Sequence, residues 1–455
     1  MVFILKVIEA FSGIGSQRQA LENINADFEI VAISEWDIRA MFAYDIMHNG
    51  KQNLKEYRHH TKESLGLELM QYTLSSNGKT SMSVQAIRGM PLLEMKAIME
   101  SIDRNNNLVD ITKIHSKDLP DSDVLTYSFP CQDLSVGGNW HHNSGGIDRD
   151  AHNRSTLLWQ VERLLKEYKV EGRKLPQFLL MENVSAILAE KHRHNFNEWC
   201  TFLSDSGYVN QIYTLNAENF GVPQSRVRTY MISVLADDEQ QADKIKKFFK
   251  DNNLENKILP EKERESLDKY LKLDYSNEIY KHEAIKNTPV FTESRKKIYE
   301  LNKVLAVDNQ VIDHAYASTI TTKQDRHPNS GIIRYDKQPL TDKNTHYRNL
   351  TARECFLLMG FKERQYDFLL QNNFKINDMG YFLTDFELDK LAGNSIVVQV
   401  LEAIFTQIIQ LKNILEKDNL MYEAKHNKDI LQQLKNDRGE KIDVVRTPAK
   451  AKRII

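Results

Sequence analysis

Short apolar segments recur along the first half of the sequence, and each ends at a turn residue or an acidic residue. The segments span residues 6–11, 29–33, 108–111, 124–128 and 178–181, with helical patterns between several of them. This alternation predicts an open α/β sheet whose neighbouring strands run parallel. Ligands of such sheets bind at the carboxyl ends of the strands. We therefore expect the residues that follow each segment to form the functional site.

The fourth apolar segment leads into Pro130-Cys131, and this cysteine is the main candidate for a nucleophile. The chain has only three cysteines, and the other two, Cys200 and Cys355, lie far away in the sequence. Their spacing fits neither a disulfide framework nor a cysteine zinc site. A polar, glycine-rich stretch over 136–153 follows and cannot bury much apolar surface. We expect it to be a lid beside the nucleophile.

A glycine turn joins the first strand to a helix that begins near Gln17. It contains Gly13 and Gly15, and the second strand ends at Glu35-Trp36. A carboxylate at that position is well placed for ribose hydroxyls, and an indole ring offers a flat face for adenine. The alternative is the structural turn of any doubly wound protein, and this motif alone separates the two interpretations poorly.

Three polar side chains alternate just before the strand predicted over 229–234. Gln224, Arg226 and Arg228 would point to one face of an extended segment. Taken by itself, this pattern favours an edge strand with a solvated basic face.

Composition sets broad limits on the kind of protein. A hydrophobic content of 41%, a charged content of 27% and a net charge of −2 are ordinary for a soluble globular chain. We see no run that approaches a membrane span. His59-His60 lacks cysteine or carboxylate neighbours at metal-ligand spacing. Three unpatterned cysteines suit a reducing cytoplasm.

Read in order, the motifs resemble those of the bacterial and phage cytosine-C5 DNA methyltransferases. The resemblance rests on eight blocks: 11–15, 35–37, 110–112, 129–132, 181–184, 224–228, 353–354 and 393–395. It implies an α/β fold, a Rossmann-like doubly wound mixed sheet of the S-adenosylmethionine-dependent methyltransferase type. It also implies a second, smaller target-recognition domain.

The resemblance implies a catalytic group of five residues. Cys131 would attack C6 of a cytosine extruded from the duplex. Glu182 would hold a proton toward N3, which requires a raised pKa. Arg228, with Arg226, would donate to O2 and to neighbouring charge. Asn183 would help to place the water or base that removes the C5 proton.

The implied cofactor is S-adenosylmethionine, with no metal. The glycine turn would support its methionine end, Glu35 its ribose, Trp36 its adenine face and Asp110-Ile111 its adenine edge. The implied wall consists of Phe11, Gly13, Gly15, Glu35, Trp36, Asp110, Ile111, Pro130, Asn394 and Ser395.

The implied partner is double-stranded DNA with a flipped target cytosine. The expected DNA-contacting residues are Gln132, Ser135, Gln224, Thr319, Gln324, Arg326 and Asn329. The loop 323–330 is the candidate for base reading, because its amide and guanidinium groups suit bidentate base contacts. Contact with phosphate or solvent alone is the alternative.

We expect a catalytic domain over 1–236 with a helical insertion at 50–107. A target-recognition domain over 237–345, a return to the catalytic domain over 346–414 and a charged helical extension and tail over 415–455 would follow. The expected setting is a cytoplasmic, nucleoid-associated monomer encoded by a bacterium or phage. It would be the methylase of a restriction–modification system, with a restriction endonuclease as genetic partner.

Three other classes compete with this interpretation. A dinucleotide-dependent oxidoreductase would share the glycine turn and Glu35 but would leave Cys131 and Glu182 unexplained. A tRNA-directed member of the same superfamily would lack a large variable domain, and this chain has one. A non-catalytic DNA-binding homologue would not need Cys131, Glu182 and Arg228.

Overall fold

The computed structural model describes residues 4–130, 147–149, 154–260, 263–343, 345–378 and 380–437, with side chains to residue 420. Residues 1–406 form one compact unit, and residues 407–455 belong to a second. The candidate site lies within the first unit. The finer division expected at residues 236, 345 and 414 stays a prediction.

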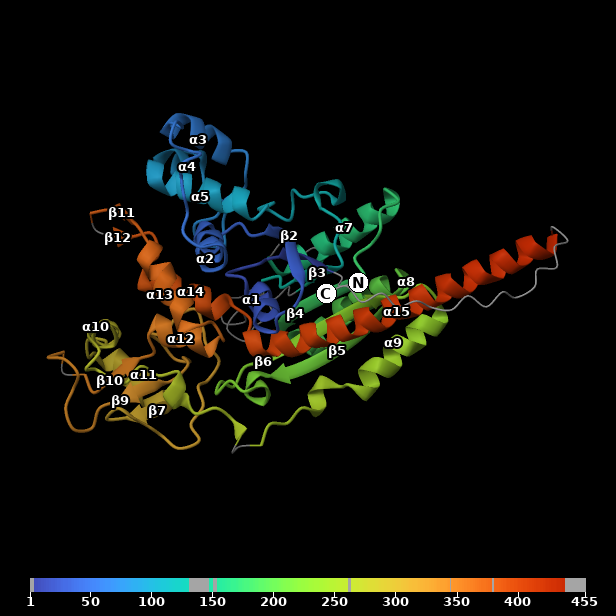
Figure 1. Cartoon of the computed structure of the whole chain (residues 1–455). Helices are drawn as coiled ribbons and strands as arrows, with labels where there is room; N and C mark the ends of the chain where they lie inside the picture. The colour runs from blue at the N-terminus through green and yellow to red at the C-terminus, as the bar shows by residue number, and fades with distance from the viewer. Residues whose placement is uncertain are drawn as a thin grey trace, which may run out of the picture. The chain divides into compact units, whose positions relative to one another are not determined.

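A six-stranded mixed sheet forms the centre of the first unit (Figure 1). Its strands are β1 (Leu5–Ala10), β2 (Phe28–Ser34), β3 (Val124–Tyr127), β4 (Phe178–Val184), β5 (Tyr208–Asn216) and β6 (Val227–Leu235). They lie in the order β2-β1-β3-β4-β6-β5. The pairs β1–β2, β1–β3 and β3–β4 are parallel, whereas β6 is antiparallel to both β4 and β5. Four of the five apolar segments are therefore strands, as predicted.

The strand predicted over 108–111 is wrong. Only a single bridge between Ile33 and Asn107 continues the sheet there. The side chain of Asn107 accepts hydrogen bonds from the backbone N–H groups of Glu35 and Val109, at 3.0 and 2.9 Å. Because a side chain satisfies these groups, the backbone leaves the ladder and turns toward the carboxyl edge of the sheet.

The edge-strand interpretation of the alternating Gln-x-Arg-x-Arg segment is also wrong. β6 lies between β4 and β5, and Gln224 and Arg226 are 0% and 5% exposed. Their polar atoms bond to backbone groups of segments found much later in the sequence. Sequence alternation alone could not reveal those partners.

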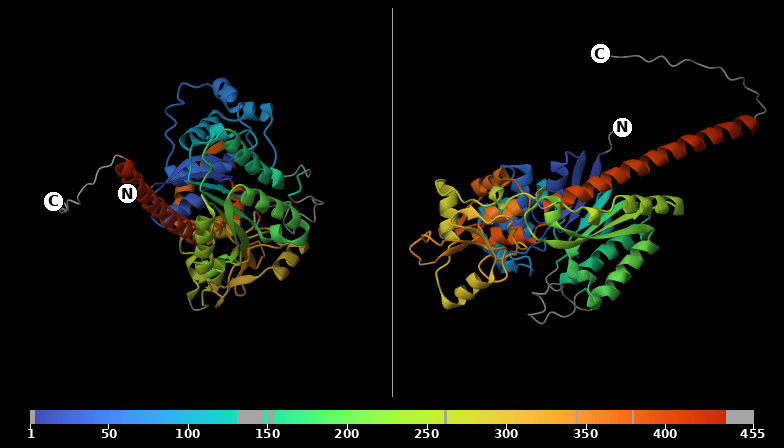
Figure 2. Two further views of the ribbon diagram at one scale, coloured as in Figure 1. Left: turned by 90° about the vertical axis from the view of Figure 1, so that its right-hand side faces the viewer. Right: turned by 90° about the horizontal axis from the view of Figure 1, so that it is seen from below.

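Helices cover both faces of the sheet (Figure 2). Helices α7 (Leu158–Val170) and α8 (Glu190–Asp205) pack on one face, where Trp159 and Trp199 belong to the main apolar cluster. Helices α1 (Ser16–Asn23) and α2 (Ile38–Asn49) cover the opposite face. There the Tyr44 hydroxyl donates to the buried Glu9 carboxylate of β1, at 2.7 Å.

The insertion expected at 50–107 contains three helices that lie together (Figure 1). They are α3 (Lys62–Leu69), α4 (Val84–Gly89) and α5 (Leu92–Arg104). Between α3 and α4 runs a loop without helix or strand that returns to the sheet edge beside Trp36.

The region expected to recognise the target contains its own small sheet. Its helices are α9 (Glu239–Asp251), α10 (Glu278–Lys286) and α11 (Glu293–Leu301). The strands β7 (Val304–Val307), β8 (Gln310–Val311), β9 (Ile332–Arg334) and β10 (Tyr347–Asn349) form a four-stranded sheet in the order β10-β9-β7-β8. The last of them, β10, lies just beyond the expected boundary at residue 345.

The segment after this small sheet consists mainly of helices. It contains α12 (Ala352–Leu358), α13 (Glu363–Asn372), the hairpin β11 (Lys375–Asn377) and β12 (Gly380–Tyr381), α14 (Asp385–Asn394) and α15 (Val398–Asp437). The predicted capping box at the start of α12 is confirmed, because Thr351 and Glu354 bond reciprocally.

One stretch, Asp385–Leu420, is long and apolar enough to cross a membrane by length and composition alone. Of its most apolar window, 61% is buried inside the protein. Core helices of soluble proteins pass the same test, so this stretch alone does not argue for a membrane location.

A buried ion pair fixes the start of α12 against the small sheet. The Arg348 guanidinium donates to both oxygens of Glu354, each at 2.8 Å, and both side chains are 0% exposed. Glu354 also accepts from the backbone N–H groups of Thr351 and Lys272, each at 2.8 Å.

Replacing Arg348 with alanine should lower the free energy of unfolding by about 3–5 kcal/mol, because a buried carboxylate would lose its cation. Denaturant unfolding measures this loss. The matched control is Arg334→Ala, since Arg334 pairs with Asp336 at the surface and should cost about 1 kcal/mol or less. Equal losses in both variants would contradict the importance of the buried pair.

Candidate active site

A cavity of about 690 Å³ opens at the carboxyl ends of β1 to β4. It lies where the apolar segments were expected to place a site, and its size suits a small-molecule ligand. Of the residues predicted from the sequence, it is lined by Phe11, Gly13, Glu35, Trp36, Asp110, Ile111, Pro130, Glu182, Arg226, Arg228 and Asn394. Cys131, Gln132 and Ser135 lie outside the described residues.

Glu35 is held by backbone donors at the end of β2. The N–H of Gly13 donates to one carboxylate oxygen at 2.9 Å, and that of Asp37 donates to the other at 2.8 Å. Burial raises the pKa of the Glu35 carboxyl to about 7, and the nearby Asp37 carboxylate adds to the shift. Each carboxylate oxygen accepts one backbone hydrogen bond and can accept a further one from a ligand hydroxyl.

Gly13 and Gly15 have different roles in the glycine turn. Gly13 has φ +55°, and a Cβ there would meet no atom within 4 Å, so backbone conformation alone favours glycine. Gly15 does not line the cavity. It has φ +81°, and a Cβ there would collide with the rings of His48 and Tyr44 on α2.

Two other residues beside the cavity hold strained backbones. Phe11 and Val109 have φ values of 59° and 62°, a conformation that a β-branched residue rarely adopts. The Ser34 hydroxyl donates to the Val109 carbonyl at 3.0 Å, and the side chain of Asn107 accepts from the Val109 N–H. Such strain is typical of functional sites, where surrounding contacts maintain it.

Asn107 was missed by the sequence analysis. It is 4% exposed and bonds both backbone groups of Glu35, accepting from the N–H at 3.0 Å and donating to the carbonyl at 2.9 Å. It thereby joins the Glu35 turn to the turn that carries Asp110. Its only sequence signal was its position just before an apolar run.

Glu182 and Arg228 form the polar end of the cavity. On the adjacent antiparallel strands, Val184 pairs with Arg228, so Glu182 and Arg228 are diagonal neighbours on one face. The Arg228 Nε atom lies 3.5 Å from a Glu182 oxygen, and both side chains are about 15% exposed or less. Burial raises the pKa of the Glu182 carboxyl. The positive charge of Arg228, and to a smaller extent that of Arg226, partly offsets this rise.

Arg226 is held by backbone carbonyls of two distant segments. Its guanidinium donates to the carbonyls of Ile320, Gly393 and Ser395 at 2.8, 3.1 and 2.8 Å. The side-chain carbonyl of Gln224 accepts from the Ile320 N–H at 3.0 Å. Ser395 does not line the cavity but contributes this carbonyl. A direct role of Arg226 in catalysis stays a prediction.

Two side chains fix the backbone immediately before Cys131. The Asn183 amide donates to the carbonyl of Phe129 at 3.1 Å, and the Ser155 hydroxyl donates to the carbonyl of Pro130 at 2.8 Å. Asn183 and Ser155 are 1% and 0% exposed, and neither lines the cavity. The sequence analysis missed Ser155, which lies in the 3-10 turn η2 (Arg154–Leu157).

Replacing Ser155 with alanine should lower the catalytic turnover number kcat roughly three- to tenfold, the value of one hydrogen bond. KM for the substrates should stay unchanged, because Ser155 does not line the cavity. Single-turnover kinetics separate these quantities, and Ser155→Thr should restore part of the rate. Ser206→Ala, which removes a hydroxyl at the end of α8, is the control. An unchanged kcat in Ser155→Ala would refute the positioning role.

The two described cysteines are poor nucleophiles. Burial raises the pKa of the Cys200 thiol to about 11, and Cys355 is fully buried, which also raises its pKa. Neither lines the cavity. A thiolate is the reactive form, so Cys131 is the remaining candidate among the three cysteines.

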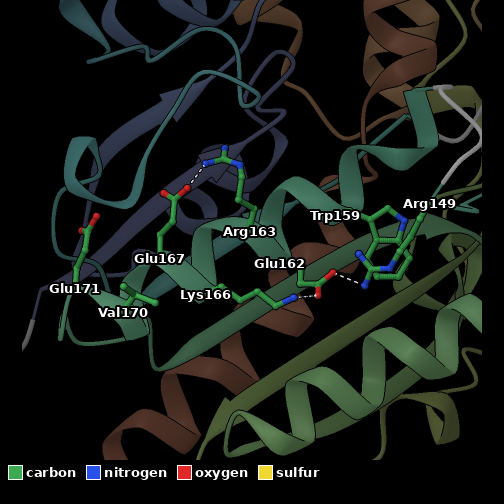
Figure 3. A pocket seen from close by; sticks show the side chains of 8 residues that line it. All are labelled: Arg149, Trp159, Glu162, Arg163, Lys166, Glu167, Val170 and Glu171. Atoms are coloured by element: carbon green, nitrogen blue, oxygen red, sulfur yellow. Dashed lines mark hydrogen bonds and ion pairs between the residues drawn. The ribbon is translucent and has the colours of Figure 1, made fainter.

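Residues 147–149, part of the predicted lid, are fixed to α7 and α8, and Figure 3 shows Arg149 beside Trp159 and Glu162 of α7. The Trp159 indole donates to the carbonyl of Ile147 at 2.9 Å. Arg149 lies 3.7 Å from the centre of the Trp159 ring and pairs with Glu162 and Glu198 at 2.6 and 2.8 Å. The other lid residues, 136–146 and 150–153, lie outside the described residues.

The surface hollow along α7 in Figure 3 is a poor candidate for the catalytic site. Its volume is about 400 Å³, and its charges pair with one another. Glu162 contacts Lys166 at 2.5 Å, and Arg163 contacts Glu167 at 2.5 Å. Glu162 also pairs with Arg149 at 2.6 Å, so the Lys166 contact helps to position a partner of the segment 147–149.

The predicted base-reading loop has one exposed candidate. Gln324 and Asn329 are 2% and 3% exposed, and the Asn329 amide donates to the Gln324 carbonyl at 2.8 Å. Arg326 is exposed. The Thr319 hydroxyl donates to the carbonyl of Ser225 at 2.8 Å. The side-chain amides of Gln324 and Asn329 bond to nearby backbone carbonyls. Contacts of these residues with bases stay a prediction.

The chain matches the family model described as C-5 cytosine-specific DNA methylase over residues 5–73 and 94–410. It is 34% identical over 417 residues to the orphan methyltransferase M.SssI of Spiroplasma monobiae, covering 89% of this chain and 97% of that protein. It is 31% identical over 412 residues to the type II methyltransferase M2.ScrFI of Lactococcus lactis subsp. cremoris, covering 90% and 99%.

A solved structure supports the same fold. The Dnmt2 methyltransferase of S. pombe superposes with a TM-score of 0.54 at 19% identity, over 90% of this chain and all of that one. The predicted fold class, an α/β fold with a doubly wound mixed sheet, is confirmed. No cluster of three or more potential metal ligands occurs among the residues that the structure describes.

Proposed function

The chain belongs to the C-5 cytosine-specific DNA methylase family, and from this premise we propose how its residues methylate cytosine in DNA. The family predicted from the sequence is thereby confirmed. One observation carries the proposal: a single cavity joins the Glu35–Trp36 wall to the Glu182–Arg228 pair. A methyl donor at the first and a cytosine at the second would meet inside it.

The cavity fits S-adenosylmethionine in size and in donor chemistry. About 690 Å³ accommodates a ligand of this size. Glu35 would bind the ribose hydroxyls, Trp36 would stack on the adenine, and Asp110 would bind its edge. When bound, S-adenosylmethionine supplies an electrophilic methyl group.

The Glu182–Arg228 pair would activate the target base. A protonated Glu182 donates toward N3, and Arg228 donates toward O2, so that negative charge on the ring is stabilised as it develops. Attack by the Cys131 thiolate forms a bond from sulfur to C6 and makes C5 nucleophilic. After C5 gains the methyl group, loss of the C5 proton expels the thiolate and restores the ring.

The proposed substrate is duplex DNA whose target cytosine is flipped into the cavity, because C6 is inaccessible within the base stack. We further propose that the protein acts as a cytoplasmic monomer in a restriction–modification setting. The type II name of the Lactococcus lactis relative supports that setting.

Methyl transfer from radiolabelled S-adenosylmethionine to duplex DNA, with tRNA as the comparison, tests the proposed substrate. We expect incorporation into DNA only. Duplex DNA with 5-fluorocytosine at the target should trap a covalent protein–DNA adduct. Transfer to tRNA alone, or no adduct in the presence of donor, would overturn the proposal.

A further inference from the structure

A compact loop over residues 74–82 lies inside the helical insertion. Its ends are joined, because the Met82 N–H donates to the Leu74 carbonyl at 2.7 Å. Its interior is organised by Ser75, whose hydroxyl donates to the Thr80 carbonyl at 2.7 Å and accepts from the Gly78 N–H at 2.9 Å. These bonds give the loop a defined shape.

The loop is attached to the chain immediately after Glu35. The Ser75 N–H donates to the carbonyl of Trp36 at 2.8 Å, and the Ile38 N–H donates to the carbonyl of Ser75 at 2.9 Å. The Arg39 guanidinium donates to the carbonyl of Ser76 at 2.5 Å. Ser75 is 0% exposed. The loop thus pairs with the segment that carries the predicted adenine-stacking residue.

Asp37 brings the loop together with two helices. One carboxylate oxygen caps α2 by accepting from the Arg39 N–H at 3.0 Å, and the other pairs with Lys390 of α14 at 2.5 Å. A Cβ on Gly78 would lie 3.1 Å from that second oxygen, and Gly78 has φ +67°. The loop tip therefore packs against a charged pair with no space for a larger residue.

The loop also forms part of the cavity wall. Gly78, Lys79 and Ser81 line the cavity together with Trp36 and Asp37. The family model matches residues 5–73 and 94–410, so the intervening residues 74–93 lie outside the matched region. Gly78, Lys79 and Ser81 therefore extend the cavity wall beyond the residues that the family model matches.

We propose that the 74–82 loop is a further part of the cofactor site, covering the adenosyl end of S-adenosylmethionine beside Trp36. The inference rests on the proposed function, which places adenosine at Glu35 and Trp36. Lys79 and Ser81 offer hydrogen-bond donors on the cavity side. Because S-adenosylhomocysteine has the same adenosyl group, the loop binds donor and product alike and slows the release of both.

Calorimetric titration of the full chain with S-adenosylhomocysteine tests the proposal. Residues 76–80 can be replaced by Gly-Gly, a turn that suits the paired flanks and keeps the backbone hydrogen bonds of Ser75 to Trp36 and Ile38. We expect the Kd of this variant to rise at least tenfold while the Kd for duplex DNA stays within twofold. Gly78→Val and Lys79→Ala, which keep the loop length, should each raise the Kd at least threefold.

Two further variants make the outcomes distinct. Arg88→Ala removes an exposed cation from the same insertion but not from the cavity, and its Kd should stay within twofold. Trp36→Ala reports on the adenosine site itself. Wild-type affinity in the loop variants, with loss in Trp36→Ala, would overturn the loop proposal alone. No binding by the wild type, or full binding by Trp36→Ala, would overturn the proposed adenosine site and this inference together. If the shortened variant fails to fold, the two point variants decide.

Discussion

Replacing Cys131 with serine should reduce methyl transfer to duplex DNA by about 10⁴-fold or more. The alcohol of serine stays protonated near neutral pH, whereas a cysteine thiol ionises readily and is intrinsically a far better nucleophile. Removal of a covalent nucleophile typically costs several orders of magnitude in rate. Single-turnover assays with radiolabelled donor measure the loss.

Cys200→Ser is the matched control for this experiment, because Cys200 is the half-buried cysteine of α8 and does not line the cavity. Its rate should stay close to that of the wild type. The Cys131→Ser variant should also fail to trap 5-fluorocytosine DNA while still binding unmodified duplex. Turnover near the wild-type rate in Cys131→Ser would refute covalent attack by this residue.

Replacing Glu182 with glutamine should lower kcat about 10²- to 10⁴-fold, the usual contribution of a general acid. Burial raises the pKa of Glu182, so the carboxyl stays protonated to higher pH than an exposed glutamate does. The wild-type rate should therefore fall as the pH rises through that raised pKa. Glu182→Gln, which cannot ionise, should lack this fall.

Arg228 provides a second measurement on the same group. Arg228 is the largest influence that lowers the pKa of Glu182, so Arg228→Ala should move the fall in rate to higher pH, and Arg228→Lys should move it less. Glu190→Gln, at an exposed position of α8, should leave the pH profile unchanged. An identical profile in Glu182→Gln and wild type would show that the fall has another origin.

Local sequence patterns predicted the parts of the fold whose determinants are local. Four of the strands could be predicted because each is a short apolar run that ends at a turn residue or an acidic residue. The capping box at Thr351 was readable because its two partners are three residues apart. The proposed catalytic pair could be predicted because Glu182 and Arg228 lie in short motifs on which the family resemblance rests.

Features that depend on distant partners could not be predicted in this way. The predicted strand over 108–111 does not form because the side chain of Asn107 bonds to the backbone of Glu35, which lies 72 residues earlier. Ser155 supports the residue before Cys131 from 25 residues later. Gln224 and Arg226 were expected on a solvated edge, but their partners are 94 to 169 residues further along the chain. Burial of polar side chains depends on such partners, and a window of sequence does not contain them.

The carbonyls held by Arg226 impose an order on biosynthesis. Its guanidinium binds Ile320, Gly393 and Ser395, and the last of these is 169 residues downstream. At a ribosomal rate of 5–20 residues per second, the nascent chain carries Arg226 for roughly 10–30 s before Ser395 is made. Closing so long a loop is also entropically costly. Because Asn394 lines the same cavity, prematurely terminated chains cannot complete it. Methyl transfer therefore requires that synthesis has passed Ser395.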